Sequence, residues 1–428
     1  MMFALVDCNN FFVSCERVFN PALEKRPVAV LSNNDGCIIA RSNEVKALGI
    51  AMGAPLFEVR AAIRQHGISI YSSNYALYGD MSARVMTVLK AFTPDIEVYS
   101  IDEAFLGLEG FQNYNLEDHA RTIHQAVRRW TGIPVSIGIG PTKTLAKAAA
   151  TLAKKAPAAK GVFDINGEDR RRAALSVIEI GDVWGIGRRW ARMLKDNGLK
   201  TALDFHDMPE AWVRKRMGVV GARTLQELQG TACLGLEEQP PAKQTLRVSR
   251  SFAKAVNSRE ILRQSVAAFA VRAAEKLRRD SLASSVVNVF VRTNRFGPRD
   301  EYYKNTHSVA QPAPGNHTSD VVRAAMTALD AIYLPGLGYK QAGVTLLGLS
   351  RESEVQLTLF HPPDPARDAR RKRLMTTLDD INTRIGSGAL RYGAVGVQAK
   401  GRAGVYTVQN RRSPRYTTNW TELPVVRA

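Results

Sequence analysis

The stretch Val98–Leu108, which reads V-Y-S-I-D-E-A-F-L-G-L, constrains the fold of this chain most tightly. Two short apolar runs, Val98–Ile101 and Ala104–Leu108, flank the acidic pair Asp102 and Glu103. Such runs around a polar pair predict two antiparallel strands joined by a turn. Two carboxylates about 4 Å apart repel each other by about 4 kcal/mol at an effective dielectric of about 20. The pair therefore belongs either to a solvated turn or to a site that holds a cation.

A third acid favours the cation site. Asp7 follows the short apolar strand expected at Phe3–Val6. An aspartate at the end of a buried strand, beside a turn with paired acids, is typical of metal sites for phosphoryl transfer. Carboxylate oxygens are also the ligands that Mg²⁺ prefers. A solvated hairpin turn stays the simpler interpretation of Asp102 and Glu103 taken alone, because acids are common in turns.

The residues after Asp7 extend this pattern. They read C-N-N-F-F, and the acidic turn carries Ser100 two residues before Asp102. An aspartate followed by paired aromatic residues, together with S-x-D-E, resembles the motifs of the Y-family (translesion) DNA polymerases. The segment S-N-N-D-G-C-I-I-A-R at 32–41 resembles the UmuC branch of that family, the catalytic subunits of bacterial DNA polymerase V. The resemblance extends over essentially the whole chain.

The resemblance implies specific roles for these residues. Asp7, Asp102 and Glu103 would hold two Mg²⁺ ions, with the carbonyl group of Cys8 as a further ligand. Phe12 would be the steric gate, whose ring lies under the incoming sugar and leaves no room for a 2′-hydroxyl group. The neighbouring Phe11 is expected in the hydrophobic core, as is usual for a phenylalanine.

Length and composition limit the number of domains and the classes of protein to which this chain can belong. The 428 residues are too many for one hydrophobic core, so two to four domains are expected. No apolar run approaches the ~20 residues of a membrane span, and the first residues lack the basic start and the cleavage site of a signal peptide. The four cysteines are scattered without C-x-x-C spacing, which argues against a zinc site or a disulfide framework and fits a reducing cytosol.

The net charge of +19 is unevenly distributed. Residues 1–165 carry 17 Lys and Arg against 15 Asp and Glu, whereas residues 166–428 carry 42 against 25. A nearly neutral first part followed by a strongly basic remainder predicts a catalytic body followed by a clamp for a polyanion such as DNA. We see no basic amphipathic helix with an aromatic face, so the chain is not expected to bind a membrane.

The expected fold class is α+β and multidomain. The resemblance implies the right-hand arrangement of the Y-family polymerases, with a palm, small fingers, a helical thumb, an α/β little finger and a C-terminal extension. The expected bounds are palm 1–23 and 76–165, fingers 24–75, a thumb like a helix-hairpin-helix 166–235, linker 236–243, little finger 244–350 and a partner-docking tail 351–428.

Periodicity and turn residues also predict individual elements. Strands are expected at 27–32, 37–40, 135–140, 247–252, 285–293 and 342–349. Helices are expected at 42–49, 81–92, 116–130, 258–280, 319–332 and 370–385, with Ser42 as the cap of the first.

Several lysines are candidates for binding phosphate. Lys143, Lys147 and Lys154 are spaced by four and seven residues, which places them within about 40° of one another on a helix. The segment G-I-G-P-T-K-T lacks a glycine before Lys143, so it is not a P-loop. A solvated helix face is the simple interpretation of the three lysines. The resemblance implies that Lys154, and Lys46 on the earlier helix, bind the triphosphate of the incoming nucleotide.

Two segments are candidates for binding DNA without reading its sequence. The motif V-W-G-I-G-R-R places Gly185, Gly187 and Arg188 at a tight turn before a helix, where backbone amides can hold a phosphate. An ordinary structural turn explains these glycines equally well. Later in the chain, the resemblance to the little finger implies that Arg250 and Ser251 contact template phosphates.

The tail carries two further motifs. Gln356, Leu357, Leu359 and Phe360 lie in Q-L-T-L-F, which matches the peptide that binds the bacterial sliding clamp. The alternative for this peptide is an edge strand of a small terminal domain. The ending R-R-S-P-R-Y-T-T-N-W at 411–420 resembles the tail of the UmuC branch, which implies docking to the processed UmuD dimer and to RecA.

The sequence thus predicts a DNA-directed DNA polymerase that uses primer-template DNA and dNTP. The resemblance implies error-prone translesion synthesis in the SOS response to DNA damage, by two-metal nucleotidyl transfer in the cytoplasm at the nucleoid. We expect no proofreading, because no separate acid cluster for a 3′→5′ nuclease is apparent. The competing hypothesis is a non-enzymatic scaffold that binds DNA at stalled forks, for which the same basic segments would serve.

Overall fold

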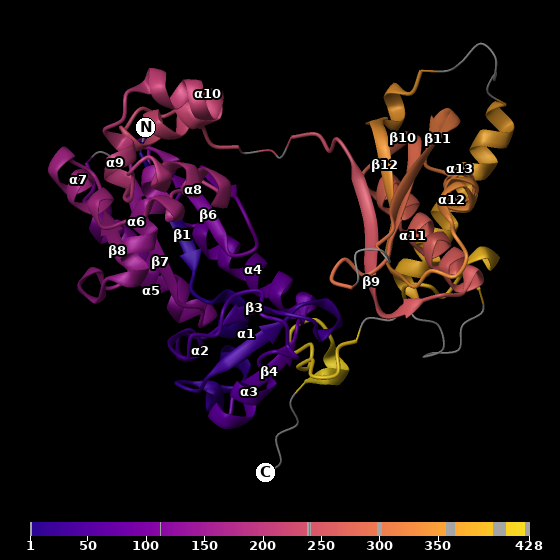
Figure 1. Cartoon of the computed structure of the whole chain (residues 1–428), viewed down its shortest axis with the longest axis horizontal. Helices are drawn as coiled ribbons and strands as arrows, with labels where there is room; N and C mark the ends of the chain where they lie inside the picture. Colours follow the sequence, from indigo (N-terminus) through magenta and orange to yellow (C-terminus); the bar gives the residue numbers. More distant parts are fainter. Residues whose placement is uncertain are drawn as a thin grey trace. The chain divides into compact units, whose positions relative to one another are not determined.

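The computed structural model describes residues 2–111, 113–237, 239, 241–297, 302–356, 364–396 and 408–423. The chain forms two compact units (Figure 1). The first comprises Met1–Pro240 together with Gln409–Ala428, and the second comprises Pro241–Val408. The chain therefore leaves the first unit once and returns to it near its end. Within the described residues, no helix is long and apolar enough to cross a membrane.

A five-stranded sheet forms the centre of the first unit, in the order β5-β6-β1-β7-β8. Its strands are β1 (Phe3–Cys8), β5 (Ile96–Val98), β6 (Glu103–Gly107), β7 (Val135–Gly140) and β8 (Val162–Asp164). The middle strand β1 pairs antiparallel with both β6 and β7. Nearly every residue of β1 is buried, because helices cover both faces of the sheet.

The two faces of β1 pack against different helices. Ala4 and Val6 point to a core shared with α1 (Phe11–Phe19), α4 (Tyr75–Leu89) and α5 (Leu116–Thr131). Phe3 and Leu5 point to the opposite face, where α6 (Lys143–Lys155) lies. A Cβ atom on Gly138 of β7 would lie 2.0 Å from the backbone nitrogen of Ala150, so only glycine allows α6 to approach the strand this closely.

A small three-stranded sheet occupies the segment predicted as fingers. Its order is β3-β2-β4, and its elements are β2 (Val28–Leu31), β3 (Ile38–Arg41), α2 (Asn43–Ala47), α3 (Arg60–His66) and β4 (Ser69–Ser72). The Ser42 side chain accepts a hydrogen bond from the backbone N–H of Val45, so it caps α2 as predicted. The outer strand β4 pairs in parallel with β2 and forms one edge of this sheet.

A bundle of short helices completes the first unit. It comprises α7 (Glu168–Ser176), α8 (Arg188–Asp196), α9 (Ala202–His206) and α10 (Glu210–Leu228). Leucine, isoleucine and valine side chains from these helices pack with Leu145 and Ala149 of α6, so the bundle continues the core of the unit. The helical character predicted for 166–235 is therefore confirmed.

The second unit is an antiparallel sheet covered by helices (Figure 1). Its strand order is β11-β10-β12-β9, from β9 (Leu246–Val256), β10 (Leu282–Arg292), β11 (Lys304–Gly315) and β12 (Tyr339–Arg351). Two helices, α11 (Arg259–Arg279) and α12 (Thr318–Ile332), bury one face of this sheet. The predicted α/β organisation of this region is confirmed.

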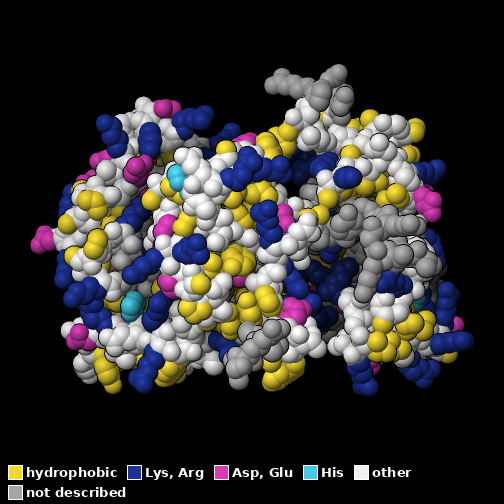
Figure 2. All heavy atoms as spheres, turned by 90° about the horizontal axis from the view of Figure 1, so that it is seen from below, with side chains coloured by type: hydrophobic (Ala, Val, Ile, Leu, Met, Phe, Trp, Pro, Cys, Tyr) yellow, Lys and Arg dark blue, Asp and Glu magenta, His cyan; other side chains and the backbone are white. Residues whose placement is uncertain are grey.

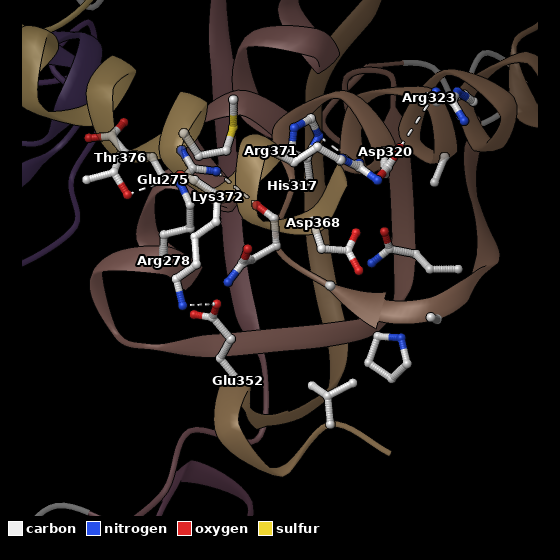
Figure 3. Close-up of a pocket in the computed structure, with 18 of the residues that line it drawn as sticks. Glu275, Arg278, His317, Asp320, Arg323, Glu352, Asp368, Arg371, Lys372 and Thr376 are labelled. Atoms are coloured by element: carbon white, nitrogen blue, oxygen red, sulfur yellow. Dashed lines mark hydrogen bonds and ion pairs between the residues drawn. The ribbon is translucent and has the colours of Figure 1, made fainter. Parts of the chain in front are cut away.

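A last helix, α13 (Pro365–Arg384), also belongs to the second unit. Arg278 donates hydrogen bonds of 2.6 and 2.7 Å to the two carboxylate oxygens of Asp379, and the methionine side chain of Met375 is buried. Around this contact lies a pocket in which Lys372 pairs with Glu352 (Figure 3). Arg371 of α13 also pairs with Asp320, so these three ion pairs connect α13 to the rest of the second unit.

The predicted elements agree with the structure except at a few places. Strands β4, β8 and β11 and helices α1 and α3 were not predicted, and α4 begins six residues before the helix predicted at 81–92. The strand predicted at Val98–Ile101 is wrong in its bounds: β5 ends at Val98, the turn covers 99–102, and Glu103 is the first residue of β6. Strand β11 reads K-N-T-H-S-V-A-Q-P-A-P-G, which is polar and contains two prolines. Such a sequence lacks the apolar alternation of a strand, and prolines are accepted there because β11 lies at the edge of its sheet.

Candidate active site

The three predicted acids meet at one end of the central strand. In the pairing of β1 with β6, Asp7 lies opposite Glu103. Asp102 immediately precedes β6, and its carbonyl oxygen accepts a 2.8 Å hydrogen bond from the backbone N–H of Cys8. The register of two strands distant in the sequence therefore brings Asp7, Asp102 and Glu103 together, as the sequence predicted.

Ser100 organises the acidic turn. Its hydroxyl oxygen accepts hydrogen bonds from the backbone N–H groups of Asp102 at 3.2 Å and Glu103 at 3.0 Å. The same hydroxyl donates to the Oδ1 atom of Asp102 at 2.6 Å. These contacts fix the turn and the direction of the Asp102 side chain, which gives a physical reason for a serine at this place in the motif.

The lysine stripe of α6 faces the carboxylates. The Nζ atom of Lys154 lies 2.8 Å from Oδ1 of Asp7, and that of Lys147 lies 3.0 Å from Oε2 of Glu103. Lys147 also lies 4.7 Å from the ring centroid of Tyr99, which stabilises its charge further. The solvated-face interpretation of these two lysines is therefore wrong, because each pairs with a site acid.

Lys143 belongs to a different environment. It is 3% exposed and pairs with the buried Glu97, away from solvent. The Oε2 atom of Glu97 also accepts a 2.7 Å hydrogen bond from the backbone N–H of Glu237. A buried charge is tolerated when it is paired and hydrogen-bonded in this way. Lys143 therefore has a structural role in the first unit.

Burial changes the proton affinity of two groups at the site. The pKa of Glu103 is raised by burial, and the charges of Asp7 and Asp102 raise it further, while the hydrogen bond from Lys147 opposes the change. The pKa of the Cys8 thiol is also raised, first by burial and then by the neighbouring Asp7. The thiol is therefore neutral and hydrophobic in character, which leaves the backbone carbonyl as the Cys8 group suited to a hard cation.

The donor groups suit magnesium in kind. Carboxylate oxygens from two adjoining strand ends are the hard ligands that Mg²⁺ prefers. Among the residues that the structure describes, no three His, Cys, Asp or Glu side chains already form a cluster that could hold a metal ion. The ammonium groups of Lys147 and Lys154 neutralise Glu103 and Asp7 instead. The residues fit a cation site in which two of the acids, Asp7 and Glu103, pair with lysines.

The two predicted aromatic residues have different environments. Phe11 is buried in the core, as predicted. Phe12 is half-buried on the first turn of α1, and its ring stacks on that of Tyr78 with centroids 4.5 Å apart and planes inclined by 15°. The ring of Tyr75 meets Phe12 edge-on at 6.1 Å. The Phe12 ring is therefore held by aromatic contacts close to the strand end that carries Asp7.

Lys46 of α2 points toward the N-terminal end of α1, near Phe12. Its Nζ atom donates hydrogen bonds to the amide oxygens of Asn10 at 2.7 Å and Asn43 at 3.4 Å. Burial lowers the pKa of Lys46, and the positive charges of Lys154 and Arg41 lower it further. Lys154 and Arg41 therefore each lie near enough to Lys46 to repel its charge, which is a favourable arrangement for binding a polyanion.

Arg41 is a member of this cationic group that the sequence analysis missed. It follows the strand predicted at 37–40, and its Nε atom is buried without a hydrogen-bond partner. An arginine at the end of a strand that leads into the Lys46 helix was the signal available in the sequence.

The predicted DNA contacts lie on exposed parts of both units. Gly185 has φ of +90°, and Gly187 is the N-cap of α8, so the predicted turn before a helix is confirmed. Arg250 is an exposed residue of β9, an edge strand of the second sheet, with Ser251 beside it. Figure 2 shows Lys and Arg side chains spread widely over the visible face, where Asp and Glu side chains are sparser.

The predicted clamp peptide can be placed only at its start. Gln356 is exposed just after β12, whereas Leu357, Leu359 and Phe360 lie outside the described residues. The ending predicted as a docking segment has a definite position. Residues 409–423 return to the first unit and lie beside β4 (Figure 1).

Comparison with known proteins agrees with this geometry. Residues 6–151 match the impB/mucB/samB family, residues 243–359 match the C-terminal domain of that family, and residues 372–426 match a domain of unknown function (DUF4113). The chain is 44% identical to Protein UmuC of Salmonella typhimurium, over 99% of both chains. It is 26% identical to DNA polymerase IV of Dehalococcoides mccartyi, over 91% of this chain and 96% of that one.

Solved structures support the same assignment of the fold. A Y-family DNA polymerase chimera of Dbh and Dpo4 matches with a TM-score of 0.64 and 21% identity, over 81% of this chain and 99% of that one. The insertion ternary complex of Dbh DNA polymerase matches with a TM-score of 0.53 and 20% identity, over 81% and 98%. The chain therefore belongs to the impB/mucB/samB family, the UmuC branch of the Y-family, and is a DNA-directed DNA polymerase.

Proposed function

We propose that this polymerase performs error-prone translesion synthesis without proofreading, by two-metal nucleotidyl transfer, in the SOS response to DNA damage. The observation that carries the proposal is the meeting of Asp7, Asp102 and Glu103 at the joined ends of β1 and β6. Three carboxylates in one place are unfavourable without cations, and here two of them are already paired with lysines.

The proposed ligands of two Mg²⁺ ions are these three carboxylates and the Cys8 carbonyl oxygen. Bound magnesium supplies charge neutralisation and activation of the primer 3′-hydroxyl group in reactions of this type. The protein itself positions the carboxylate ligands. Ser100 orients the Asp102 side chain, and the strand register holds Asp7 opposite Glu103.

Lys46 and Lys154 are the proposed triphosphate ligands. Both reach the region beside Asp7, and both have pairing partners that a phosphate can replace. We propose that Lys154 moves from Asp7 to the triphosphate when a nucleotide binds, which frees the Asp7 carboxylate. Phe12 would then lie under the sugar, and its stacking on Tyr78 would hold the ring where a 2′-hydroxyl group clashes with it.

The remaining sites of the proposal concern larger partners. Gly185, Gly187 and Arg188 would hold a phosphate of the primer-template duplex, and Arg250 and Ser251 would hold the template strand. Gln356 and the following Leu357, Leu359 and Phe360 would bind the sliding clamp. The processed UmuD dimer and RecA are proposed as further partners, and the cytoplasm, at the nucleoid, as the location.

Primer extension across a template abasic site tests the proposal. The reaction contains Mg²⁺ and is run with and without sliding clamp, RecA filament and processed UmuD. We expect Asp102→Ala to lower nucleotide addition by roughly a thousandfold, because several kcal/mol of transition-state stabilisation is lost with a ligand. DNA binding should stay unchanged, since Asp102 is not among the proposed DNA contacts.

Asp80→Ala is the matched control, because Asp80 is a carboxylate of α4 that pairs with Arg84 at 2.8 Å and is not at the site. It should extend primers like the unaltered chain. If the unaltered chain extends no primer in any mixture while both proteins still bind DNA, the non-enzymatic scaffold at stalled forks is the better explanation.

A further inference from the structure

Near its end the chain returns to the first unit and pairs with the edge strand β4 at one position. We call residues 409–423 the C-terminal strap. Arg412 pairs in parallel with Ser72 of β4, and the backbone N–H of Ser72 donates a 3.0 Å hydrogen bond to the carbonyl oxygen of Arg411. The Gln409 side chain donates to the carbonyl oxygen of Ser73 at 3.2 Å. The strap thereby covers the edge of β4 at its last residue, Ser72.

Ser413 anchors the strap in the interior. Its side chain is 5% exposed, and the Asn74 amide donates hydrogen bonds to its carbonyl oxygen at 3.1 Å and to its hydroxyl oxygen at 3.0 Å. Asn74 is also the N-cap of α4. Farther along the strap, the ring of Tyr416 stacks on Phe19 of α1 at 4.8 Å. The strap thus contacts α1 and α4, the two helices that hold the proposed steric gate.

A chain of contacts leads from Ser413 to Phe12. The Ser413 hydroxyl donates to Oε1 of Glu16 at 3.0 Å, and the Tyr78 hydroxyl donates to the same oxygen at 2.7 Å. The ring of Tyr78 stacks on Phe12. Glu16 is 2% exposed, so its carboxyl group is not solvated by water. The two hydroxyl groups supply the hydrogen bonds that a buried carboxyl group needs.

We infer that the C-terminal strap positions the steric gate, with Ser413 acting through Glu16 and Tyr78 on Phe12. The inference rests on the proposed role of Phe12 in sugar selection. Ser413 is a positioning residue, since it contacts neither nucleotide nor Phe12. A strap that only closed the sheet edge would need its backbone contacts to β4, whereas it would not need a buried hydroxyl group on Glu16.

Sugar selectivity is the property that separates these two roles. The ratio of kcat/KM for a deoxynucleotide to that for the matching ribonucleotide is measured for Ser413→Ala, Ser413→Thr and Thr418→Ala in the full chain. Removing the Ser413 hydroxyl should lower this ratio about threefold or more, because small displacements at a site have large kinetic effects. The change should appear mainly as a lower ribonucleotide KM.

Ser413→Thr keeps a hydroxyl group and should restore most of the selectivity. Thr418→Ala, at an exposed position of the strap, should behave like the unaltered chain. If Ser413→Ala lowers the use of both sugars equally, or leaves the ratio unchanged, the positioning role is overturned.

Hydrogen exchange gives a second readout that needs no catalysis. Amides of α1 and of the first turn of α4 should exchange faster in Ser413→Ala than in Thr418→Ala, while those of α11 in the second unit should not change. Unchanged exchange in α1 and α4 would overturn the inference by itself. If the unaltered chain adds no nucleotide, the proposed function fails, and the exchange experiment still decides whether the strap holds the Phe12 helix.

Discussion

At the scale of single residues, the sequence predicted that Asp7, Asp102 and Glu103 lie together, but it did not predict which lysines pair with them. The spacing of Lys147 and Lys154 predicts one helix face, because helical geometry is local. Their partners Glu103 and Asp7 depend on how α6 crosses the sheet, which no local pattern determines. Arg41 was missed for the same reason, since its closeness to Lys46 arises from tertiary packing.

Phe12 gives a direct prediction at this scale. Phe12→Ala should raise ribonucleotide insertion relative to deoxynucleotide insertion by about tenfold, because a steric clash worth about 1–3 kcal/mol is removed. Single-nucleotide insertion with paired dNTP and rNTP substrates measures the ratio. Phe111→Ala, which removes a phenylalanine ring that packs on Tyr114 and His119 and contacts neither Phe12 nor the strap, is the control. Equal sugar selectivity in Phe12→Ala and the unaltered chain would remove Phe12 from the gate role.

Glu16 predicts a dependence of stability on pH. Burial raises its folded-state pKa above the ordinary value of 4.5, so the folded protein binds this proton more tightly than the unfolded chain does. The contribution to stability is complete below pH 4.5 and is lost as the pH rises through the raised pKa. The unaltered chain should therefore gain stability relative to Glu16→Gln as the pH falls from neutral towards 4.5.

Urea unfolding of both proteins at several pH values in this range, followed by tryptophan fluorescence, measures the difference. Because the glutamine side chain introduced by Glu16→Gln does not titrate, all other groups cancel in the comparison. A difference that stays constant with pH, or that grows in the opposite direction, would contradict the buried environment of the Glu16 carboxyl group.

At the scale of elements, the sequence predicted those with a clear period and a clear end. Helix α5 and strand β7 agree with prediction because amphipathic or apolar runs end there at glycine or a polar cap. Strand β11 and the C-terminal strap were not predicted as strand pairings. Each is polar and lies at a sheet edge. Neither shows the apolar alternation that predicts a strand, and each pairs with a segment that is distant in the sequence.

The peptide 356–360 is an element whose proposed role stays a prediction. Replacing Leu359 and Phe360 by alanine should abolish stimulation by the sliding clamp and leave extension without the clamp unchanged, because only the apolar contacts to the clamp are lost. Leu423→Ala, which removes an exposed leucine of the strap, serves as the control. Primer extension with a titration of clamp measures the effect, and persistent stimulation would place docking elsewhere.

At the scale of the whole molecule, the match to a domain of unknown function covers parts of two different units. Residues 372–426 begin within α13 of the second unit and end beyond the strap on the first. The sequence predicted this region as one tail, 351–428, because nothing in its composition marks where it returns to the first unit. The contacts that hold the returned segment include the buried Ser413, one isolated bridge to Ser72 and the stacking of Tyr416 on Phe19.

This return has a consequence for the time course of synthesis. The first unit cannot be completed when its own 240 residues have left the ribosome, because the strap follows the entire second unit. At about 5–20 residues per second, the intervening segment takes roughly 10 to 30 s to make. During that interval β4 has an open edge and Glu16 lacks one of its two hydroxyl partners. A chain whose translation stops early would therefore carry Asp7, Asp102 and Glu103 and yet lack the hydrogen bond from Ser413 to Glu16.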